Sequence, residues 1–334
     1  MKFPKFWLKQ SKAKFVDISV LFAPLSLLWK FFSYLSTLFG KNEIMPIPVV
    51  CVGNITLGGN GKTPTVIKFF QLLRNLGYNP HIVSRGYKSK LKGPLLVCSQ
   101  TNSHIEVGDE PLMLATYGPT WVSRERSLGI KSAAKANADI VILDDGFQNN
   151  SVFKDFSFVV VDTSVGFGNE KIIPAGPLRE PINVGLQRAD MIIAIGSKSE
   201  QEAFGAKIKL FTNTELVHGK LVPSSSNFDI RNKEVICFAG IAHPKKFFHF
   251  VESLGAKVLK TYSFPNHKPL KEKTLKRLAA EAKKNGAFLV TTEKDFVRIP
   301  LQYKELIKEI KVELTLDNTD LIYEKLKQLK KSVE

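Results

Sequence analysis

The sequence has few cysteines, and none of them stands in a pattern typical of a structural site. Of its 334 residues only Cys51, Cys98 and Cys237 are cysteines, and each stands alone. An odd count without a C-x-x-C pair argues against a disulfide scaffold and against a zinc site. We therefore expect reduced thiols in a cytosolic compartment.

Acidic residues are also scarce relative to basic ones. The chain has 31 Asp and Glu against 48 Lys and Arg, a formal net charge of +17. Such an excess suits nucleic acid, an anionic membrane or an acidic substrate. The basic residues gather towards the two ends and do not form one block with interleaved aromatics. We therefore expect no nucleic-acid partner, although charge alone does not choose between the other two.

The first 14 residues lack acidic residues, and the uncharged run that follows Asp17 is short. Residues 1–14 hold five lysines, and the uncharged run over residues 18–29 has 12 residues. A bilayer span needs about 20 apolar residues, and no small-x-small cleavage site follows Trp29. Two interpretations stay open, a buried helix and an interfacial helix with lysines on anionic headgroups. We favour the second and assign residues 1–45 as a membrane-associated helical segment.

The remaining sequence alternates apolar strands with helices. Apolar runs at residues 46–55, 138–145 and 156–162 are separated by helical patterns, as over residues 63–77. Continuous apolar strands of this kind predict an α/β fold, a parallel sheet with helices on both faces. The Pro- and Ser-containing stretch near residue 222 is the best linker. We expect a core domain over residues 46–221 and a smaller C-terminal α/β domain over 222–334.

A glycine-rich stretch, GNITLGGNGKTP, follows the first strand and opens the first helix of this core. Glycines allow the backbone angles with which N–H groups surround a phosphate, and a lysine and a hydroxyl follow them. Thr56 replaces the first glycine of the full P-loop pattern, so GGxGKT remains. The predicted nucleotide-binding residues are Gly58, Gly59, Asn60, Gly61, Lys62, Thr63 and Pro64.

Two aspartates follow a later apolar strand, in ILDDGFQ. A P-loop needs an acidic partner on a neighbouring strand to hold magnesium, and Asp144 and Asp145 stand where a Walker B motif places it. Gln148 is close enough in sequence to orient a metal-bound water. The pattern predicts a Mg²⁺–nucleotide site, and since no guanine-reading N-K-x-D stretch is present, we expect ATP. An alternative is a P-loop regulatory or metallochaperone-type NTPase, but the chain has no Cys/His cluster and Leu57 stands where an early lysine is needed.

Seven motifs together resemble the tetraacyldisaccharide 4′-kinases, the lipid A 4′-kinases. In order they are VGNITLGGNGKTP, SRGYKSK, VGDEPLMLA, ILDDGFQ, IIPAGPLREP, FPNHK and TTEKDFVR, between Ile47 and Arg298. The resemblance implies transfer of the ATP γ-phosphate to the 4′-hydroxyl of a tetraacylated glucosamine disaccharide 1-phosphate. It also implies a place at the cytoplasmic face of the bacterial inner membrane, peripheral or N-terminally anchored, in lipid A biosynthesis.

The resemblance also implies roles for single residues. Asp109 is the expected base, His267 its partner and Lys62 a further catalytic residue, and an Asp–His pair can share a proton. The expected magnesium ligands are Thr63, Asp144, Asp145, Glu110 and Gln148. The expected substrate-binding residues are Asn54, Arg85, Arg126 and Arg179, and arginine suits bidentate contact with phosphate.

The chain departs from the family pattern at one position beside the expected catalytic histidine. The family usually has Asp before this histidine, whereas Asn266 stands here. A neutral amide raises the pKa of the neighbouring imidazole less than a carboxylate does. The TTEKDFVR motif has no role that the sequence assigns.

Overall fold

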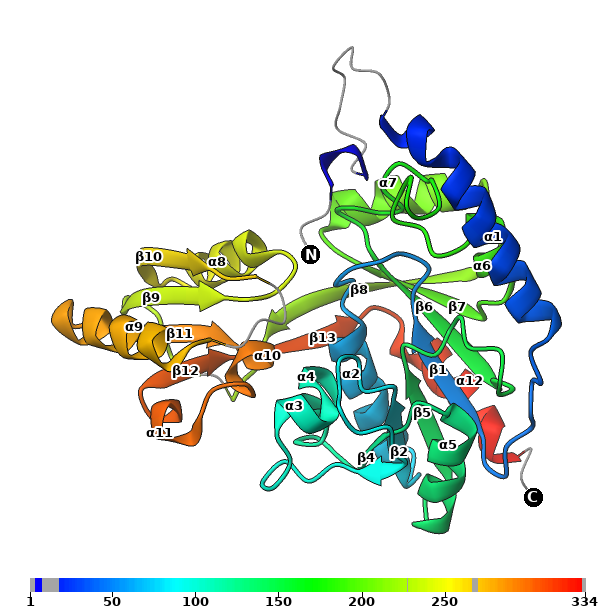
Figure 1. Cartoon of the computed structure of the whole chain (residues 1–334), viewed down its shortest axis with the longest axis horizontal. Helices are drawn as coiled ribbons and strands as arrows, with labels where there is room; N and C mark the ends of the chain where they lie inside the picture. The colour runs from blue at the N-terminus through cyan, green and yellow to red at the C-terminus, as the bar shows by residue number, and fades with distance from the viewer. Residues whose placement is uncertain (1–3, 8–17, 227, 266–269, 332–334) are drawn as a thin grey trace.

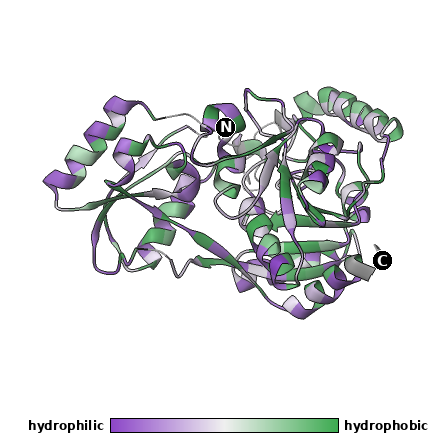
Figure 2. Ribbon diagram, turned by 90° about the horizontal axis from the view of Figure 1, so that it is seen from below, coloured by the Kyte–Doolittle hydropathy of each residue, from purple (hydrophilic) through white to green (hydrophobic). Residues whose placement is uncertain are grey.

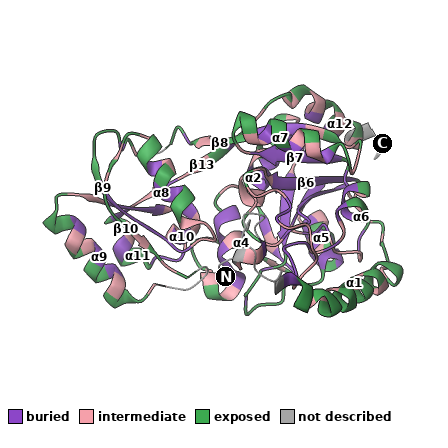
Figure 3. Ribbon diagram, turned by 90° about the horizontal axis from the view of Figure 1, so that it is seen from above, coloured by how far each residue is buried: buried purple, intermediate pink, exposed green. Residues whose placement is uncertain are grey.

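The computed structural model describes the chain except residues 1–3, 8–17, 227, 266–269 and 332–334. Its described part contains two sheets, and Figure 1 shows the strands β8 and β13 running between them. The central strands of the larger sheet, among them β6 and β7, are almost completely buried, as Figure 3 shows by colour. This confirms the predicted α/β class.

The larger sheet has nine strands, and all its inner pairs are parallel. Only the edge pairs β13–β8 and β3–β4 are antiparallel. From one edge to the other the strands are β13 (Val312–Leu316), β8 (Glu215–Pro223), β7 (Met191–Ile195), β6 (Phe156–Asp162), β1 (Val49–Gly53), β5 (Ile140–Asp144), β2 (Pro80–Ser84), β4 (Thr120–Val122) and β3 (Leu95–Leu96). Parallel strands end at one edge, so β1, β5 and β2 bring their C-terminal residues together there.

Helices cover both faces of this sheet and divide its core in two. One core is formed with α2 (Lys62–Asn75), α4 (Asp109–Leu114) and α12 (Thr319–Lys331). The other is formed with α5 (Arg126–Lys135), α6 (Ile182–Gln187) and α7 (Lys198–Ile208). In α2 the predicted apolar face is buried, and Gly77, with φ of 82°, lies just past its end as expected.

The smaller sheet is wholly parallel and has its own two-sided core. Its strands, in spatial order, are β10 (Lys257–Ser263), β9 (Glu234–Ala239), β11 (Phe288–Thr292) and β12 (Ile307–Ile310). Its helices are α8 (Pro244–Ser253), α9 (Glu272–Lys284), α10 (Glu293–Phe296) and α11 (Leu301–Lys304). The short helix α3 (His104–Val107) belongs to the other unit and precedes α4.

The predicted boundary between residues 46–221 and 222–334 needs correction at both ends. Strand β8 continues to Pro223, and β13 pairs with it antiparallel. Helix α12 then packs Ile322 and Leu326 into the first core, where the Tyr78 hydroxyl donates to the Leu326 carbonyl at 3.1 Å. The smaller unit is therefore an insertion over residues 224–311, because the end of the chain returns to cover the larger sheet.

The N-terminal region forms a separate apolar helix. After the short 3-10 helices η1 (Lys5–Trp7) and η2 (Ile18–Phe22), α1 (Ala23–Leu38) contains no buried residue. Leu27 and Phe32 are 67% and 64% exposed, and Figure 2 shows α1 as mostly hydrophobic. Residues 19–38 have the length and composition of a possible membrane span. The buried-helix interpretation is wrong, because no residue of α1 is buried.

Candidate active site

The glycine loop lies between β1 and α2, as predicted. Gly58 and Gly61 have φ of 112° and 86°, where a side chain would be strained, while Gly59 does not need a positive φ. The Asn60 amide donates to Thr56 Oγ1 at 2.5 Å and closes the loop. Lys62 is the first residue of α2. The partial positive charge of this helix end and the free N–H groups suit an anion.

The two predicted aspartates have different surroundings. Asp144, the last residue of β5, is 2% exposed and accepts a hydrogen bond from Ser84 Oγ at 2.9 Å. Asp145 has φ of 52° and turns towards the loop, where Lys62 Nζ lies 3.7 Å from its Oδ1. Arg179 binds Asp145 with both terminal nitrogens, at 2.8 and 3.1 Å. Arg179 was predicted as a substrate-binding residue, and in the structure its guanidinium binds Asp145.

These surroundings move the two aspartate pKa values apart. Burial and the neighbouring Glu110 and Asp145 carboxylates raise the pKa of Asp144 to about 7. Burial also acts to raise the pKa of Asp145, but the charges of Lys62 and Arg179 outweigh it and lower that pKa. The site therefore holds one firmly ionised carboxylate and one that is short of cationic neighbours.

A divalent cation fits this arrangement in one respect. Lys62 acts to lower the pKa of Asp144 but does not outweigh burial and the repulsion from Glu110 and Asp145, and a bound Mg²⁺ would relieve that repulsion. Among the residues that the structure describes, no group of three or more His, Cys, Asp and Glu is arranged to hold a metal by itself. Mg²⁺ commonly binds through one or two carboxylates together with nucleotide phosphates, and Thr63 lies beside Lys62 in the first turn of α2.

Gln148 and Asn54 lie beside this cluster. Gln148 accepts from Arg179 at 3.0 Å and donates to the Asn54 carbonyl at 2.8 Å and to Glu180 at 2.9 Å. It therefore holds Arg179, a role that the sequence did not predict. The side chain of Asn54 is fully buried and neither of its polar atoms has a hydrogen-bond partner. Such atoms are free to bind a ligand or water.

The other two predicted arginines differ in exposure. Arg126 is 3% exposed, and its Nη1 donates to the Ser123 carbonyl at 2.9 Å. Burial lowers the pKa of Arg126, whereas Asp144 and Asp145 act to raise it, so its charge faces the aspartates. Arg85 is exposed in the turn after β2.

The predicted base lies at the N-terminus of α4. Asp109 is 8% exposed, and its Oδ2 lies 3.7 Å from Nε of Arg298. Arg298 in turn pairs with Asp295, which accepts from the Gly240 N–H at 2.9 Å. The predicted partner His267, with Asn266 before it, lies outside the described residues.

The TTEKDFVR motif contacts the same helix from the smaller sheet. Lys294 Nζ binds Glu110 Oε1 at 2.7 Å, and Tyr117 donates to Glu293 Oε1 at 2.6 Å. Burial acts to raise the pKa of Glu110, but Lys294 outweighs it and lowers that pKa. Glu110 was predicted as a metal ligand, and its partner here is Lys294. The motif thus joins α10 to α4, a role that its local sequence does not signal.

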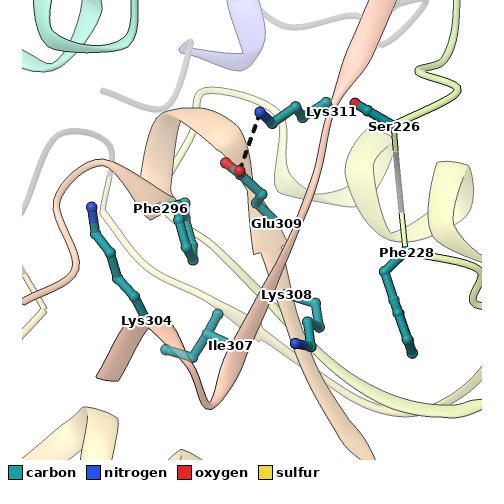
Figure 4. A pocket seen from close by; sticks show the side chains of 8 residues that line it. All are labelled: Ser226, Phe228, Phe296, Lys304, Ile307, Lys308, Glu309 and Lys311. Carbon is teal, nitrogen blue, oxygen red and sulfur yellow. Dashed lines mark ion pairs between the residues drawn. The ribbon is translucent and has the colours of Figure 1, made fainter. Parts of the chain in front are cut away.

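A hollow lies away from this cluster, in the smaller unit. It has a volume of about 320 Å³, and Figure 4 shows the eight side chains that line it, among them Phe228, Phe296 and Lys304. None of the predicted site residues lines it. A narrower hollow of about 10 Å³ lies directly at the glycine loop, between Asn60, Trp7 and His243.

A glycine loop at a helix N-terminus, a lysine, and an acidic strand end define a P-loop phosphotransferase of the α/β class. The chain belongs to the tetraacyldisaccharide-1-P 4′-kinase family, whose profile matches residues 18–330.

Relatives and a solved structure agree with this membership. The tetraacyldisaccharide 4′-kinase of Dinoroseobacter shibae is 47% identical over 82% of each chain. That of Jannaschia sp. is 40% identical over 95% of this chain and 96% of its own. LpxK from Aquifex aeolicus, crystallised in complex with ATP, superimposes with a TM-score of 0.76 at 27% identity, over 93% of this chain and 99% of its own. The regulatory or metallochaperone-type alternative finds no support in these matches.

Proposed function

We propose that this chain transfers the γ-phosphate of ATP to the 4′-hydroxyl of a tetraacylated glucosamine disaccharide 1-phosphate. The observation that carries the proposal is that two groups of charged side chains lie at one site. Lys62 and Arg179 converge on Asp145 at the glycine loop, and Asp109 begins a helix joined to the same site through Glu110. Family membership supplies the identity of the acceptor.

Positive charge beside the phosphates supports phosphoryl transfer. Loop N–H groups and the N-terminus of α2 bind the phosphates, and Lys62 stabilises the charge that develops on the transferred group. Arg179 and Gln148 hold Asp145 in place for the same purpose. Mg²⁺, held with the nucleotide by Thr63, Asp144 and Asp145, would neutralise phosphate charge.

Asp109 is the proposed base for the attacking hydroxyl. A carboxylate within reach of that hydroxyl can accept its proton as the oxygen–phosphorus bond forms. Arg298 and the Asp295 carboxylate behind it restrict where the Asp109 carboxylate points. His267 completes the pair in this proposal, as the sequence predicts.

Substrate contacts are proposed for Asn54 and Arg85, whereas Arg126 and Arg179, also predicted as substrate-binding residues, are proposed to support the charges of the site. The unpaired polar atoms of Asn54 suit a sugar hydroxyl or a phosphate oxygen. Exposed Arg85 suits an anionic group that arrives from solvent or from a membrane surface. Arg126 is buried, so its proposed role is to contribute positive charge beside Asp144 and Asp145.

The membrane is the proposed location of the reaction, with α1 as the element that contacts it. A lipid acceptor stays in a bilayer, and α1 exposes leucines and aromatics along its length. Tyr34 suits the boundary between headgroups and acyl chains. We propose docking at the cytoplasmic face of the inner membrane. Lys2, Lys9, Lys12 and Lys14, which this proposal also uses, lie outside the described residues.

The test is transfer of radiolabel from γ-labelled ATP to the purified disaccharide lipid in mixed micelles. The proposal expects labelled lipid whose formation requires Mg²⁺ and the free 4′-hydroxyl. A lipid with a blocked 4′-hydroxyl is the control and should stay unlabelled. Label on the blocked lipid, or ATP hydrolysis without labelled lipid, would contradict the proposal.

A further inference from the structure

The loop over residues 171–179, called the bridging loop here, lies between α1 and the phosphate-binding loop. On one side it pairs with the strand end that leads into the glycines. The Leu57 N–H donates to the Pro177 carbonyl at 2.8 Å, and the Arg179 N–H donates to the Ile55 carbonyl at 2.8 Å. Thr56 and Leu178 thus form an antiparallel bridge.

The other side of the bridging loop is held by α1. Ser26 Oγ donates to the Ile172 carbonyl at 2.9 Å and accepts from the Ala175 N–H at 3.2 Å. One turn further along the helix, Trp29 Nε1 donates to the Arg179 carbonyl at 2.9 Å. The outward-facing helix therefore binds the main chain of the residue whose guanidinium holds Asp145.

Arg179 is thus bound by α1 through its main chain and binds Asp145 through its side chain. The main chain of Arg179 is fixed from one side by Ile55 and from the other by Trp29. Its side chain is bidentate on Asp145 and also contacts Gln148. A bidentate arginine requires a well-placed main chain, because both of its hydrogen bonds depend on one orientation.

We propose that Trp29 is a positioning residue for phosphoryl transfer, which holds the Arg179 carbonyl and thereby the guanidinium on Asp145. The inference rests on the proposed function and goes beyond it. Docking of α1 then supports the phosphate site in addition to attaching the chain to lipid. Ser26 acts in the same way at the start of the bridging loop.

The first test needs no substrate. Trp29→Phe keeps an aromatic ring and removes the N–H donor together with one ring of the indole, and the fold should be retained because Trp29 is 47% exposed. Hydrogen exchange should become about three- to tenfold faster at the amides of Leu57 and Arg179, which join the bridging loop to the strand end. Phe32→Leu, on the same helix but away from the bridging loop, is the matched control and should leave both amides unchanged. Unchanged exchange in Trp29→Phe would overturn the inference.

The second test separates positioning from membrane attachment. In Trp29→Phe, kcat should fall about three- to tenfold while vesicle binding and the KM for the lipid stay within twofold. A residue that served only as an anchor would instead raise the KM and leave kcat unchanged. That outcome would also overturn the inference.

A double-mutant cycle tests whether Trp29 acts through Arg179. After Arg179→Lys has removed the bidentate contact, Trp29→Phe should lower kcat by less than a further twofold, because both changes act on one interaction. Full additivity of the two losses would show that Trp29 acts elsewhere. A wild-type protein that labels no lipid would contradict the proposed function, and the exchange experiment would still decide this inference.

Discussion

At the residue scale, the positive charges of the site are distributed unequally between Asp144 and Asp145. Asp145 has both Lys62 and Arg179, whereas buried Asp144 has a serine hydroxyl and two neighbouring carboxylates. Opposite charges favour an ionised carboxylate and burial disfavours it, so the two adjacent residues titrate at different pH. Each of the first three predictions concerns one charge in this cluster.

Removal of the loop lysine should abolish most turnover. Lys62→Ala removes a charge that stabilises the transferred phosphoryl group, and kcat should fall on the order of 10²-fold or more. Lys135→Ala, in the exposed last turn of α5, is the matched control and should keep wild-type turnover. Near-normal kcat for Lys62→Ala in the lipid-labelling assay would contradict the P-loop assignment.

Asp109→Asn should separate chemistry from nucleotide binding. If Asp109 accepts the hydroxyl proton, kcat should fall on the order of 10²-fold or more, with the Kd for ATP within about twofold of wild type. Calorimetry of ATP binding beside the turnover assay measures both. Asp320→Asn, exposed in the first turn of α12, should change neither. Loss of ATP binding in Asp109→Asn would instead indicate that Asp109 binds the metal and is not the base.

Asp144 should make the nucleotide-free protein less stable as the pH rises. Its pKa is raised from 3.8 to about 7 by burial and by Glu110 and Asp145, so the folded state holds its proton more tightly. That contribution to stability is complete below about pH 4 and is lost as the pH rises through about 7. Denaturant titrations should show that the free energy of unfolding declines less over this window in Asp144→Asn. Parallel pH profiles for the two proteins would disagree with this placement of Asp144.

At the element scale, local patterns predicted the parts and long-range contacts decided the assembly. The strand–glycine loop–helix order from β1 to α2 follows from residues close in sequence, as does the position of Asp144 at a strand end. The contacts of Lys294 with Glu110 and of Arg179 with Asp145 join residues 184 and 34 positions apart. No local periodicity encodes such pairs, so neither the sequence pattern nor the family resemblance predicted these contacts.

The return of the chain to the larger sheet was missed for the same reason. Strand β13 alternates in burial as an edge strand does, and its partner β8 lies about ninety residues earlier, beyond a whole inserted unit. The composition near residue 222 correctly marks a connection between the two units. Only the pairing of β8 with β13 shows that the chain passes between the units twice. Strand pairing across an insertion depends on tertiary contacts rather than on propensity.

The junction of α10 with α4 should depend on a buried arginine. Arg298 and Asp295 are 4% and 3% exposed, so Arg298→Leu leaves the carboxylates of Asp295 and Asp109 without their cation. Breaking a buried pair of this kind costs about 3–5 kcal/mol in the free energy of unfolding. Arg231→Leu removes a similar pair with Asp229 whose side chains are 77% and 62% exposed. Denaturant unfolding should show a large loss for the first and little for the second, and equal losses would argue against the buried junction.

At the scale of the whole molecule, an apolar helix lies at one side of a basic chain. The net charge is +17, and α1 exposes its apolar side chains outside both cores. An anionic bilayer suits both features, because basic residues near its surface contribute about 1 kcal/mol each and apolar area adds about 25 cal/mol per Å² buried. The first contribution weakens with salt and the second does not.

Vesicle binding should therefore weaken with salt without vanishing, and it should depend on α1. Leu28→Asp places a charge on the exposed apolar surface of α1 and should lower co-sedimentation with anionic vesicles about tenfold or more. Leu210→Asp changes an equally apolar residue outside α1 that is 82% exposed, and it should bind as wild type does. Equal losses in both variants would show that α1 is not the contact.

The most direct test of the central claim is the position of the phosphate in the product. Wild-type protein, ATP, Mg²⁺ and the disaccharide 1-phosphate are incubated, and the lipid product is examined by phosphorus and proton NMR. The account predicts one new monophosphate ester coupled to the proton at the 4′ carbon, with Lys62→Ala yielding on the order of a hundredth of it or less. A diphosphate at the 1-position, or unchanged lipid beside hydrolysed ATP, would contradict the account.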